Sequence, residues 1–139
     1  MNFAIIGLGY WGKNYLRILN SIDEINLVAV VEPNPKIKID KDINQLDDLD
    51  KLLDKELNID AAIVCTPTKT HYEISKKLLS NGINILVEKP LSTKSSEANE
   101  LINLAAQEGL VLLVDHTFLY NRAINFAIEK INDGEIGSL

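Results

Sequence analysis

Three glycines near the N-terminus, Gly7, Gly9 and Gly12, constrain the fold of this chain more than any other feature. Their pattern, G-x-G-x-x-G, follows a short apolar run at residues 3–6 and precedes a helical apolar pattern at residues 11–20. In that setting the first glycine permits a tight turn, the second lets a pyrophosphate approach the backbone, and the third lets the helix pack against the strand. The helix N-terminus then offers unpaired N–H groups to phosphates. The pattern therefore predicts a strand–turn–helix unit that binds a dinucleotide.

An acidic residue completes this fingerprint. Glu32 ends the apolar run at residues 26–31 and follows Gly12 by twenty residues, where an acid commonly binds ribose hydroxyls. Two other interpretations of the glycines stay open. They could form a turn of purely structural use, or bind a nucleoside-type ligand such as S-adenosylmethionine.

Composition narrows the class of protein. The 139 residues suffice for one domain with a real core, and 46% hydrophobic with 24% charged residues is typical of soluble globular proteins. A formal net charge of −6 argues against a nucleic-acid or anionic-membrane partner. No signal peptide or membrane-length apolar stretch is visible, and the single cysteine, Cys65, fits a reducing cytoplasm. Two histidines and one cysteine, widely separated, predict no metal site.

Strand-like apolar runs alternate with helical patterns along the chain. The runs are short, continuous and rich in Val, Ile or Ala, which is typical of strands buried on both faces of a parallel sheet. They lie at residues 3–6, 26–31, 61–65, 83–87 and 110–114. The helical patterns lie at residues 11–20, 45–56, 71–80 and 94–107. This order predicts an α/β fold with a doubly wound parallel sheet of the Rossmann type, which binds ligands outside the carboxyl ends of its strands.

Two segments depart from the regular alternation. After Glu32, the sequence P-N-P runs into residues 36–40, whose alternating pattern predicts a short edge strand and leaves a following helix missing or reduced to a turn. Residues 120–133 predict a further helix with one apolar face, leading away from the sheet. We therefore expect a dinucleotide-binding domain at residues 1–119, and a linker helix with the start of a second domain at residues 120–139.

Further polar groups follow the predicted strands at their carboxyl ends: Thr66 and Pro67 with His71 beyond them, then Glu88, Lys89 and Pro90, then Asp115, His116 and Thr117. The stretches G-x-G-Y-W-G-K-N, C-T-P-T-x-x-H, E-K-P-L-S and D-H-T-F-L-Y-N resemble the nicotinamide-dependent Gfo/Idh/MocA oxidoreductases. The resemblance is closest to the branch that oxidises sugars and nucleotide sugars, and it spans nearly the whole chain. Its most specific element is E-K-P combined with the N-terminal glycines.

The resemblance implies roles for these residues. The three glycines, with the backbone of Tyr10 and Trp11, would hold the pyrophosphate of NAD, and Glu32 would take the adenosine ribose hydroxyls. The remaining cofactor contacts would come from Thr66, Pro67 and His71 along the cleft, and from Glu88 and His116 near the nicotinamide. From the residues alone, simpler interpretations stay open: Tyr10 and Trp11 as core, each histidine as a packing or capping residue, and Cys65 as a small buried hydrophobe.

Lys89 is the expected catalytic residue. The resemblance implies that its ammonium points at the substrate carbinol or carbonyl, where it would stabilise the negative charge that develops on the oxygen. An ordinary surface lysine is the alternative. A separate base must accept the hydroxyl proton. In the family that base, most of the substrate pocket and much of the oligomer interface belong to a C-terminal catalytic domain, which we expect to be absent from this chain.

The sequence thus predicts the NAD-binding domain of a sugar or nucleotide-sugar dehydrogenase, inactive as these residues alone. NAD is preferred to NADP because the charge of Glu32 repels a 2′-phosphate, although Lys36 and Lys38 follow closely and could soften the preference. Homo-oligomerisation is possible. The alternative from another class is a non-catalytic module that binds or senses a nucleotide.

Overall fold

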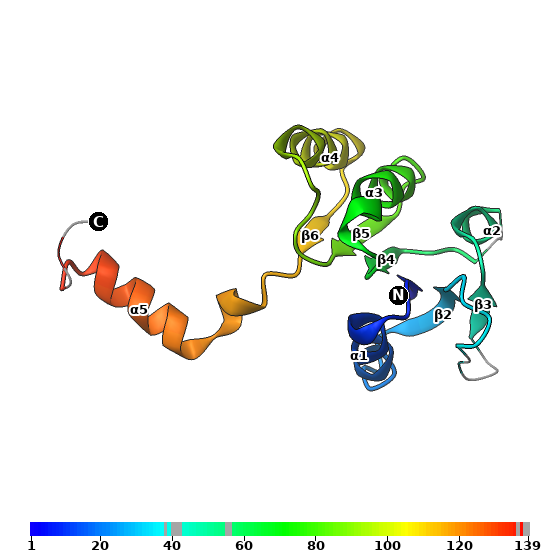
Figure 1. Ribbon diagram of the computed structural model, residues 1–139, viewed down its shortest axis with the longest axis horizontal. Helices are drawn as coiled ribbons and strands as arrows, with labels where there is room; N and C mark the ends of the chain where they lie inside the picture. Colours follow the sequence, from blue (N-terminus) through cyan, green and yellow to red (C-terminus); the bar gives the residue numbers. More distant parts are fainter. Residues whose placement is uncertain (38, 40–42, 55–56, 136, 138–139) are drawn as a thin grey trace.

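A computed structural model describes residues 1–37, 39, 43–54, 57–135 and 137 (Figure 1). Six strands form one sheet: β1 (Asn2–Ile6), β2 (Asn26–Val31), β3 (Asn44–Leu46), β4 (Ala61–Val64), β5 (Asn84–Val87) and β6 (Leu112–Val114). Their order is β3-β2-β1-β4-β5-β6 and every neighbouring pair is parallel. The predicted doubly wound parallel sheet is therefore confirmed, with the order reversing between β1 and β4.

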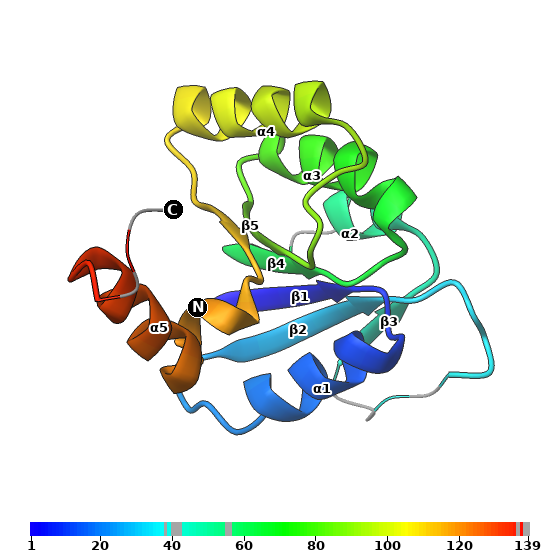
Figure 2. The same ribbon diagram turned by 60° about the vertical axis from the view of Figure 1, so that its left-hand side comes forward.

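Helices cover both faces of this sheet, and the last described helix, α5, leads away from it. They are α1 (Tyr10–Leu19), α2 (Leu49–Leu53), α3 (His71–Leu79), α4 (Ser95–Glu108) and α5 (Arg122–Asn132), with single 3₁₀ turns η1 (Thr68–Thr70) and η2 (Thr117–Tyr120). Figure 2 shows α3 and α4 on one side of the sheet and α1 on the other. Because successive strand side chains point to opposite faces, Ala4 and Ile6 of β1 pack with the buried leucines of α2, α3 and α4, whereas Ile5 packs with Leu19 of α1.

The sequence prediction was wrong about where the edge strand forms and where the helix after it begins. The edge strand forms at Asn44–Leu46, where it pairs with Ala29–Val31 of β2 and buries Leu46. The helix predicted from residue 45 therefore begins only at Leu49, after Asp48 caps it by accepting a hydrogen bond from the Asp50 N–H. The described residues 36, 37 and 39 of the expected edge strand are not in a strand, and residues 38 and 40 lie outside the described residues. A turn at residues 35–36 follows β2, as predicted.

The last helix leaves the body of the molecule, as predicted (Figure 1). Its N-cap is Asn121, whose side chain accepts hydrogen bonds from the N–H groups of Ala123 and Ile124. Ile124, Phe126 and Ile128 are exposed on it, at 37%, 59% and 43% of their surface. No helix among the described residues is long and apolar enough to cross a bilayer.

We expect Gly12→Ala to lower the free energy of unfolding by about 3 kcal/mol, measured by urea denaturation. A Cβ at residue 12 would lie 2.1 Å from the carbonyl oxygen of Gly7, so α1 would have to move away from the end of β1. Gly9→Ala is the matched control. A Cβ there meets nothing within 4 Å, and its effect should stay below about 1 kcal/mol, the range of an N-cap change. Equal stabilities of the two variants would contradict this account of the close approach.

Candidate functional site

The glycine loop after β1 is packed against β4 on one side and open on the other. Gly7 has a φ of +91°, which favours glycine, and its N–H donates to the carbonyl oxygen of Val31 at 2.8 Å. A Cβ at Gly7 would meet the carbonyl oxygen of Cys65 and the Cγ2 of Thr66 at 3.0 Å. At Gly9, in contrast, the space is free. The loop therefore leaves room for a ligand at the second glycine, next to the N-terminus of α1.

Tyr10 and Trp11, the first residues of α1, lie at the surface. They are 78% and 45% exposed, and their rings form an edge-to-face pair with centroids 5.4 Å apart. The interpretation of these two aromatic residues as core is wrong. Helix α1 instead buries Gly12 and Leu19, and at Gly12 the close approach to Gly7 leaves no room for a side chain.

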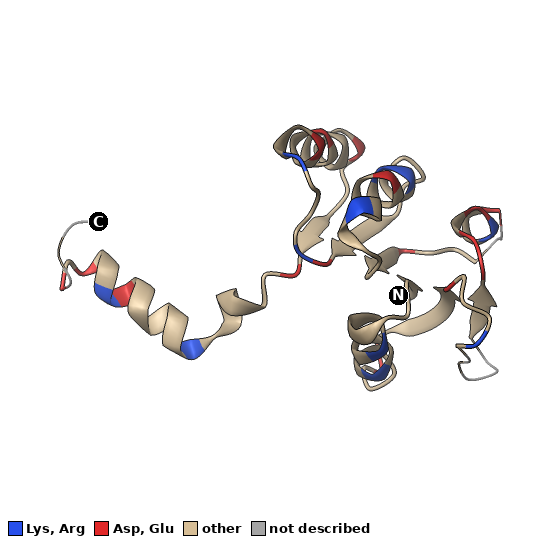
Figure 3. Cartoon of the chain, in the orientation of Figure 1, with Lys and Arg blue, Asp and Glu red and all other residues tan. Residues whose placement is uncertain are grey.

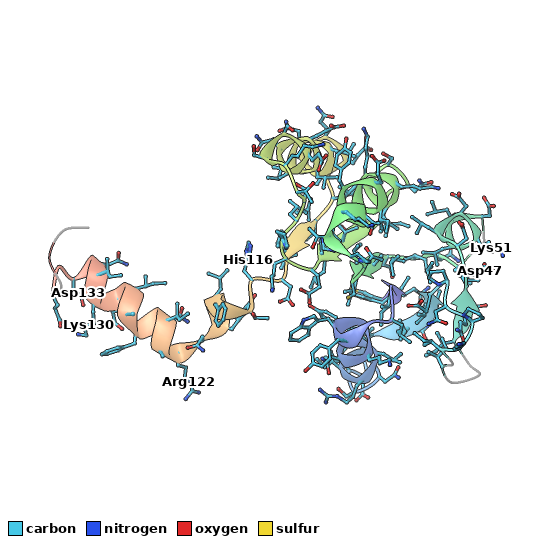
Figure 4. All side chains as sticks on the ribbon, viewed as in Figure 1. Asp47, Lys51, His116, Arg122, Lys130 and Asp133 are labelled. Carbon is cyan, nitrogen blue, oxygen red and sulfur yellow. The ribbon has the colours of Figure 1, made fainter. Side chains whose placement is uncertain are left out.

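Glu32 joins the glycine loop to the end of β2. Its carboxylate accepts hydrogen bonds from the N–H of Leu8 at 2.7 Å and from the N–H of Asn34 at 2.9 Å. A carboxylate has about four lone-pair sites, so both oxygens can still accept bonds from a ligand. Beside it lies an open cavity of about 770 Å³, lined by Glu32, Pro33, Pro35, Gln45, Leu46, Asp47, Lys51 and Asp54. The side chains of Asp47 and Lys51 form a 2.6 Å surface ion pair at this edge of the sheet (Figure 4).

The sheet register places the other predicted residues along the same edge. The N–H groups of Cys65, Glu88 and Asp115 each donate to the last carbonyl of the neighbouring strand, at 2.8 to 2.9 Å. The first residue after each of β4, β5 and β6 is thus held in line with the others. Charged segments of both signs lie together there, where the chain leaves β6 (Figure 3).

His71 connects two of these strand-end loops. Its ring is 1% exposed, with Nδ1 2.9 Å from the carbonyl oxygen of Pro90 and Nε2 2.8 Å from the carbonyl oxygen of Thr66. The Thr66 hydroxyl also accepts a bond from Thr70 at 2.8 Å, while Pro67 is exposed. Because both ring nitrogens of His71 contact backbone, this residue links the loop after β4 to the loop after β5.

A network of acidic groups lies beneath the end of β5. The Tyr15 hydroxyl of α1 donates to Oδ2 of Asp115 at 2.6 Å, and burial followed by this bond raises the pKa of Tyr15. Glu88 is 7% exposed; its Oε2 accepts a 3.2 Å bond from the Lys89 N–H, and its Oε1 has no partner among the described residues. Burial, and next the charge of Asp115, raise the pKa of Glu88.

Cys65 borders the same network and is not poised as a nucleophile. Burial, with smaller contributions from Glu88 and Asp115, raises the pKa of its thiol to about 12. Its side chain packs in the core cluster that contains Ile5 and Ile63. The expectation of a small hydrophobic role is therefore supported.

Lys89 and His116 are exposed beside a second cavity, of about 330 Å³. This cavity is lined by Lys89, Asp115, His116, Thr117, Phe118, Leu119 and Ile124, and so is partly walled by η2 and α5. Figure 4 places His116 where the chain passes from the sheet toward α5, far from Asp47 and Lys51. The predicted residues thus divide into a glycine-loop and Glu32 group at β1–β3 and a Lys89 and His116 group at β5–β6.

The sequence analysis assigned no role to Tyr15 or Asp115. Asp115 carried a usable signal, because it directly follows a predicted strand as the other site residues do. Nothing in the sequence around Tyr15 indicated its role, because its hydrogen-bond partner, Asp115, lies 100 residues away along the chain.

We expect Glu88→Gln to increase the free energy of unfolding at pH 8, because the amide keeps the side chain neutral in its buried position. A carboxyl whose folded pKa is raised lowers stability as pH rises from its unfolded value, about 4.5, through its folded value. The gain should therefore shrink as the pH falls toward 4.5. Glu24→Gln, at an exposed site, is the control and should show no such dependence. A pH-independent difference for Glu88→Gln, in urea denaturation at several pH values, would contradict the assignment.

Comparisons with known proteins support this geometry. The model of the Gfo/Idh/MocA family, described as an oxidoreductase family with an NAD-binding Rossmann fold, matches residues 1–116. The 2,7-anhydro-N-acetylneuraminate hydratase of Mediterraneibacter gnavus is 30% identical over the whole chain, which covers 37% of that protein. The UDP-N-acetylglucosamine 3-dehydrogenase of Acidithiobacillus ferrooxidans is 27% identical over 91% of the chain, which covers 40% of that protein.

Solved structures of dehydrogenases and related proteins superpose closely on this chain. GenD2 from gentamicin A biosynthesis, crystallised in complex with NAD, superposes with a TM-score of 0.87 at 27% identity, over 97% of this chain and 40% of its own. The myo-inositol 2-dehydrogenase from Lactobacillus plantarum gives a TM-score of 0.85 at 25% identity, over all of this chain and 43% of its own. The chain spans about 40% of the length of these relatives. With its glycine loop, its strand order and the family match over residues 1–116, this chain belongs to the Gfo/Idh/MocA oxidoreductases as an NAD-binding Rossmann domain.

Proposed function

We propose that this chain binds NAD(H) with its adenosine half over β1–β3 and its nicotinamide half over β4–β6. The observation that carries the proposal is the Glu32 carboxylate, which the Leu8 N–H holds at 2.7 Å from the glycine loop. This bond fixes an acid beside the open space at Gly9, so one ligand can meet the loop through its pyrophosphate and Glu32 through a ribose.

The remaining residues take roles along the same path. The backbone at Tyr10 and Trp11 begins α1 and would offer N–H groups to the pyrophosphate. Thr66 and Pro67 would line the middle of the cleft, with His71 holding their loop. Glu88 and His116 would lie at the nicotinamide end, and Lys89 beyond them toward the substrate.

Glu32 also supports a preference for NAD over NADP. Its carboxylate can accept hydrogen bonds from both ribose hydroxyls, whereas a 2′-phosphate would bring negative charge against it. The nearby Lys36 is exposed and oriented by a turn in which its N–H donates to the Asn34 side chain at 3.1 Å. An exposed lysine is screened by solvent and offsets this repulsion only partly.

The bound cofactor would serve hydride transfer to or from a sugar or nucleotide sugar. Two relatives, one named for UDP-N-acetylglucosamine and one for myo-inositol, act on polyhydroxylated substrates. NAD supplies the hydride acceptor when it is bound. The Lys89 ammonium, beside the 330 Å³ cavity, would stabilise the substrate oxygen as its proton leaves. We place the proton acceptor and most of the substrate pocket in sequence beyond these 139 residues.

We expect this chain to bind NADH more tightly than NADPH, measured by nicotinamide fluorescence titration. Glu32→Ala should reduce the preference at least about tenfold, equivalent to roughly 1.4 kcal/mol of lost repulsion. Glu32→Gln keeps an oxygen that can accept from Leu8, so it separates the loss of charge from the loss of the loop contact. Glu24→Ala, at an exposed position, should leave the preference unchanged. Tighter binding of NADPH by the unchanged chain would contradict the proposed cofactor choice.

We expect these 139 residues to bind NADH weakly and to produce no sugar-dependent NADH, because positioning of substrate and base is worth many powers of ten in rate. In a longer protein containing this domain and active on a sugar, Lys89→Ala should lower kcat at least about 100-fold while changing NADH affinity less than about threefold. Robust turnover by the short chain would contradict the need for further residues. NADH binding with no activity in any longer protein would favour a nucleotide-binding module instead.

A further inference from the structure

Two carboxyl groups lie at the half of the cleft opposite Glu32. Glu88 follows β5 and Asp115 follows β6, and these two strands are neighbours at the far edge of the sheet from β3. A dinucleotide fold binds one nucleotide over each half of its sheet. If Glu32 receives the adenosine half, the second nucleotide lies over the strand ends that carry Glu88 and Asp115.

The two members of this pair differ in how well their surroundings compensate a negative charge. The Tyr15 hydroxyl donates to Asp115 at 2.6 Å, and a hydrogen bond to a carboxylate stabilises its ionised form. Glu88 receives one bond, from the Lys89 N–H at 3.2 Å, and its buried Oε1 has no partner among the described residues. The side chain of Lys89 is exposed. Solvent therefore screens its ammonium more than it screens the buried carboxyl group.

We propose that the Glu88–Asp115 pair makes this site bind the oxidised nicotinamide ring more tightly than the reduced ring. The oxidised ring carries a positive charge and the reduced ring is neutral, so a negative pair in a partly desolvated site favours the former. This inference rests on the proposed binding of NAD(H). It assigns to the pair a role distinct from that of Glu32, which discriminates at the ribose of the other nucleotide.

The alternative is a pair that is neutralised in the presence of the ligand. The charge of Asp115 raises the pKa of Glu88, and a proton held between the two carboxyls would reduce the charge that faces the ring. Such a pair would hold the middle of α1 to the residue after β6 through Tyr15 but would not distinguish the two redox states. The two possibilities differ in the ratio of two affinities, which a purely structural effect on the cleft leaves unchanged.

The test compares dissociation constants of the 139-residue chain for NADH, by fluorescence titration, and for NAD⁺, by competition against NADH. Asp115→Asn and Glu88→Gln each remove a charge while keeping the size of the side chain. We expect both to lower the ratio of Kd(NADH) to Kd(NAD⁺) at least about fivefold, mainly through weaker NAD⁺ binding. Glu24→Gln removes one negative charge at an exposed position just before the start of β2 and should keep the original ratio.

The outcomes separate this inference from the function on which it rests. An unchanged ratio in both variants, or equal weakening of both ligands, would overturn the inference while leaving cofactor binding intact. Binding of neither ligand by the unchanged chain would contradict the proposed function, and the inference with it. Circular dichroism of each variant checks that the fold is retained, and two independent variants protect the test against one that fails to fold.

Discussion

The close approach of α1 to the end of β1 is the constraint on which the rest of this site depends. Gly12 packs so tightly that a Cβ would lie 2.1 Å from the carbonyl oxygen of Gly7, and Gly7 itself lies against the ends of β2 and β4. Four elements thus meet at one point. The turn directs the first N–H groups of α1 toward the carboxyl edge of the sheet, where parallel strands bring their following residues together.

The sheet register in turn determines which residues lie side by side at the carboxyl edge of the sheet. Backbone hydrogen bonds between neighbouring strands continue one residue past β4, β5 and β6, so Cys65, Glu88 and Asp115 are held in line. Side-chain bonds then connect this line to the loops around it. Glu32 holds the glycine loop through the N–H of Leu8. Tyr15 of α1 binds Asp115, which follows β6 at the edge of the sheet opposite β3.

The two ends of the cleft differ in what they can recognise. The Glu32 end is open and polar, beside a cavity of about 770 Å³, and in the proposed function it receives a nucleoside through its hydroxyls. The Lys89 end is smaller and walled by apolar residues of η2 and α5, including Phe118 and Ile124. Helix α5 projects from the sheet with apolar side chains exposed, so the Lys89 end borders a larger apolar surface than the Glu32 end.

The amino-acid sequence by itself determined the fold class, and it predicted that the candidate site lies at the carboxyl edge of the sheet. Glycine spacing and continuous apolar runs are local patterns, and they predicted five of the strands, the crossover helices and the position of Glu32. Only the tertiary structure decided that β3 forms at Asn44–Leu46, because an edge strand is selected by pairing with β2 and not by its own periodicity. It also decided that Tyr10 and Trp11 are exposed. The hydrogen bond between Tyr15 and Asp115 could not be predicted from the sequence either, because the two residues are 100 positions apart and only the folded sheet brings them together.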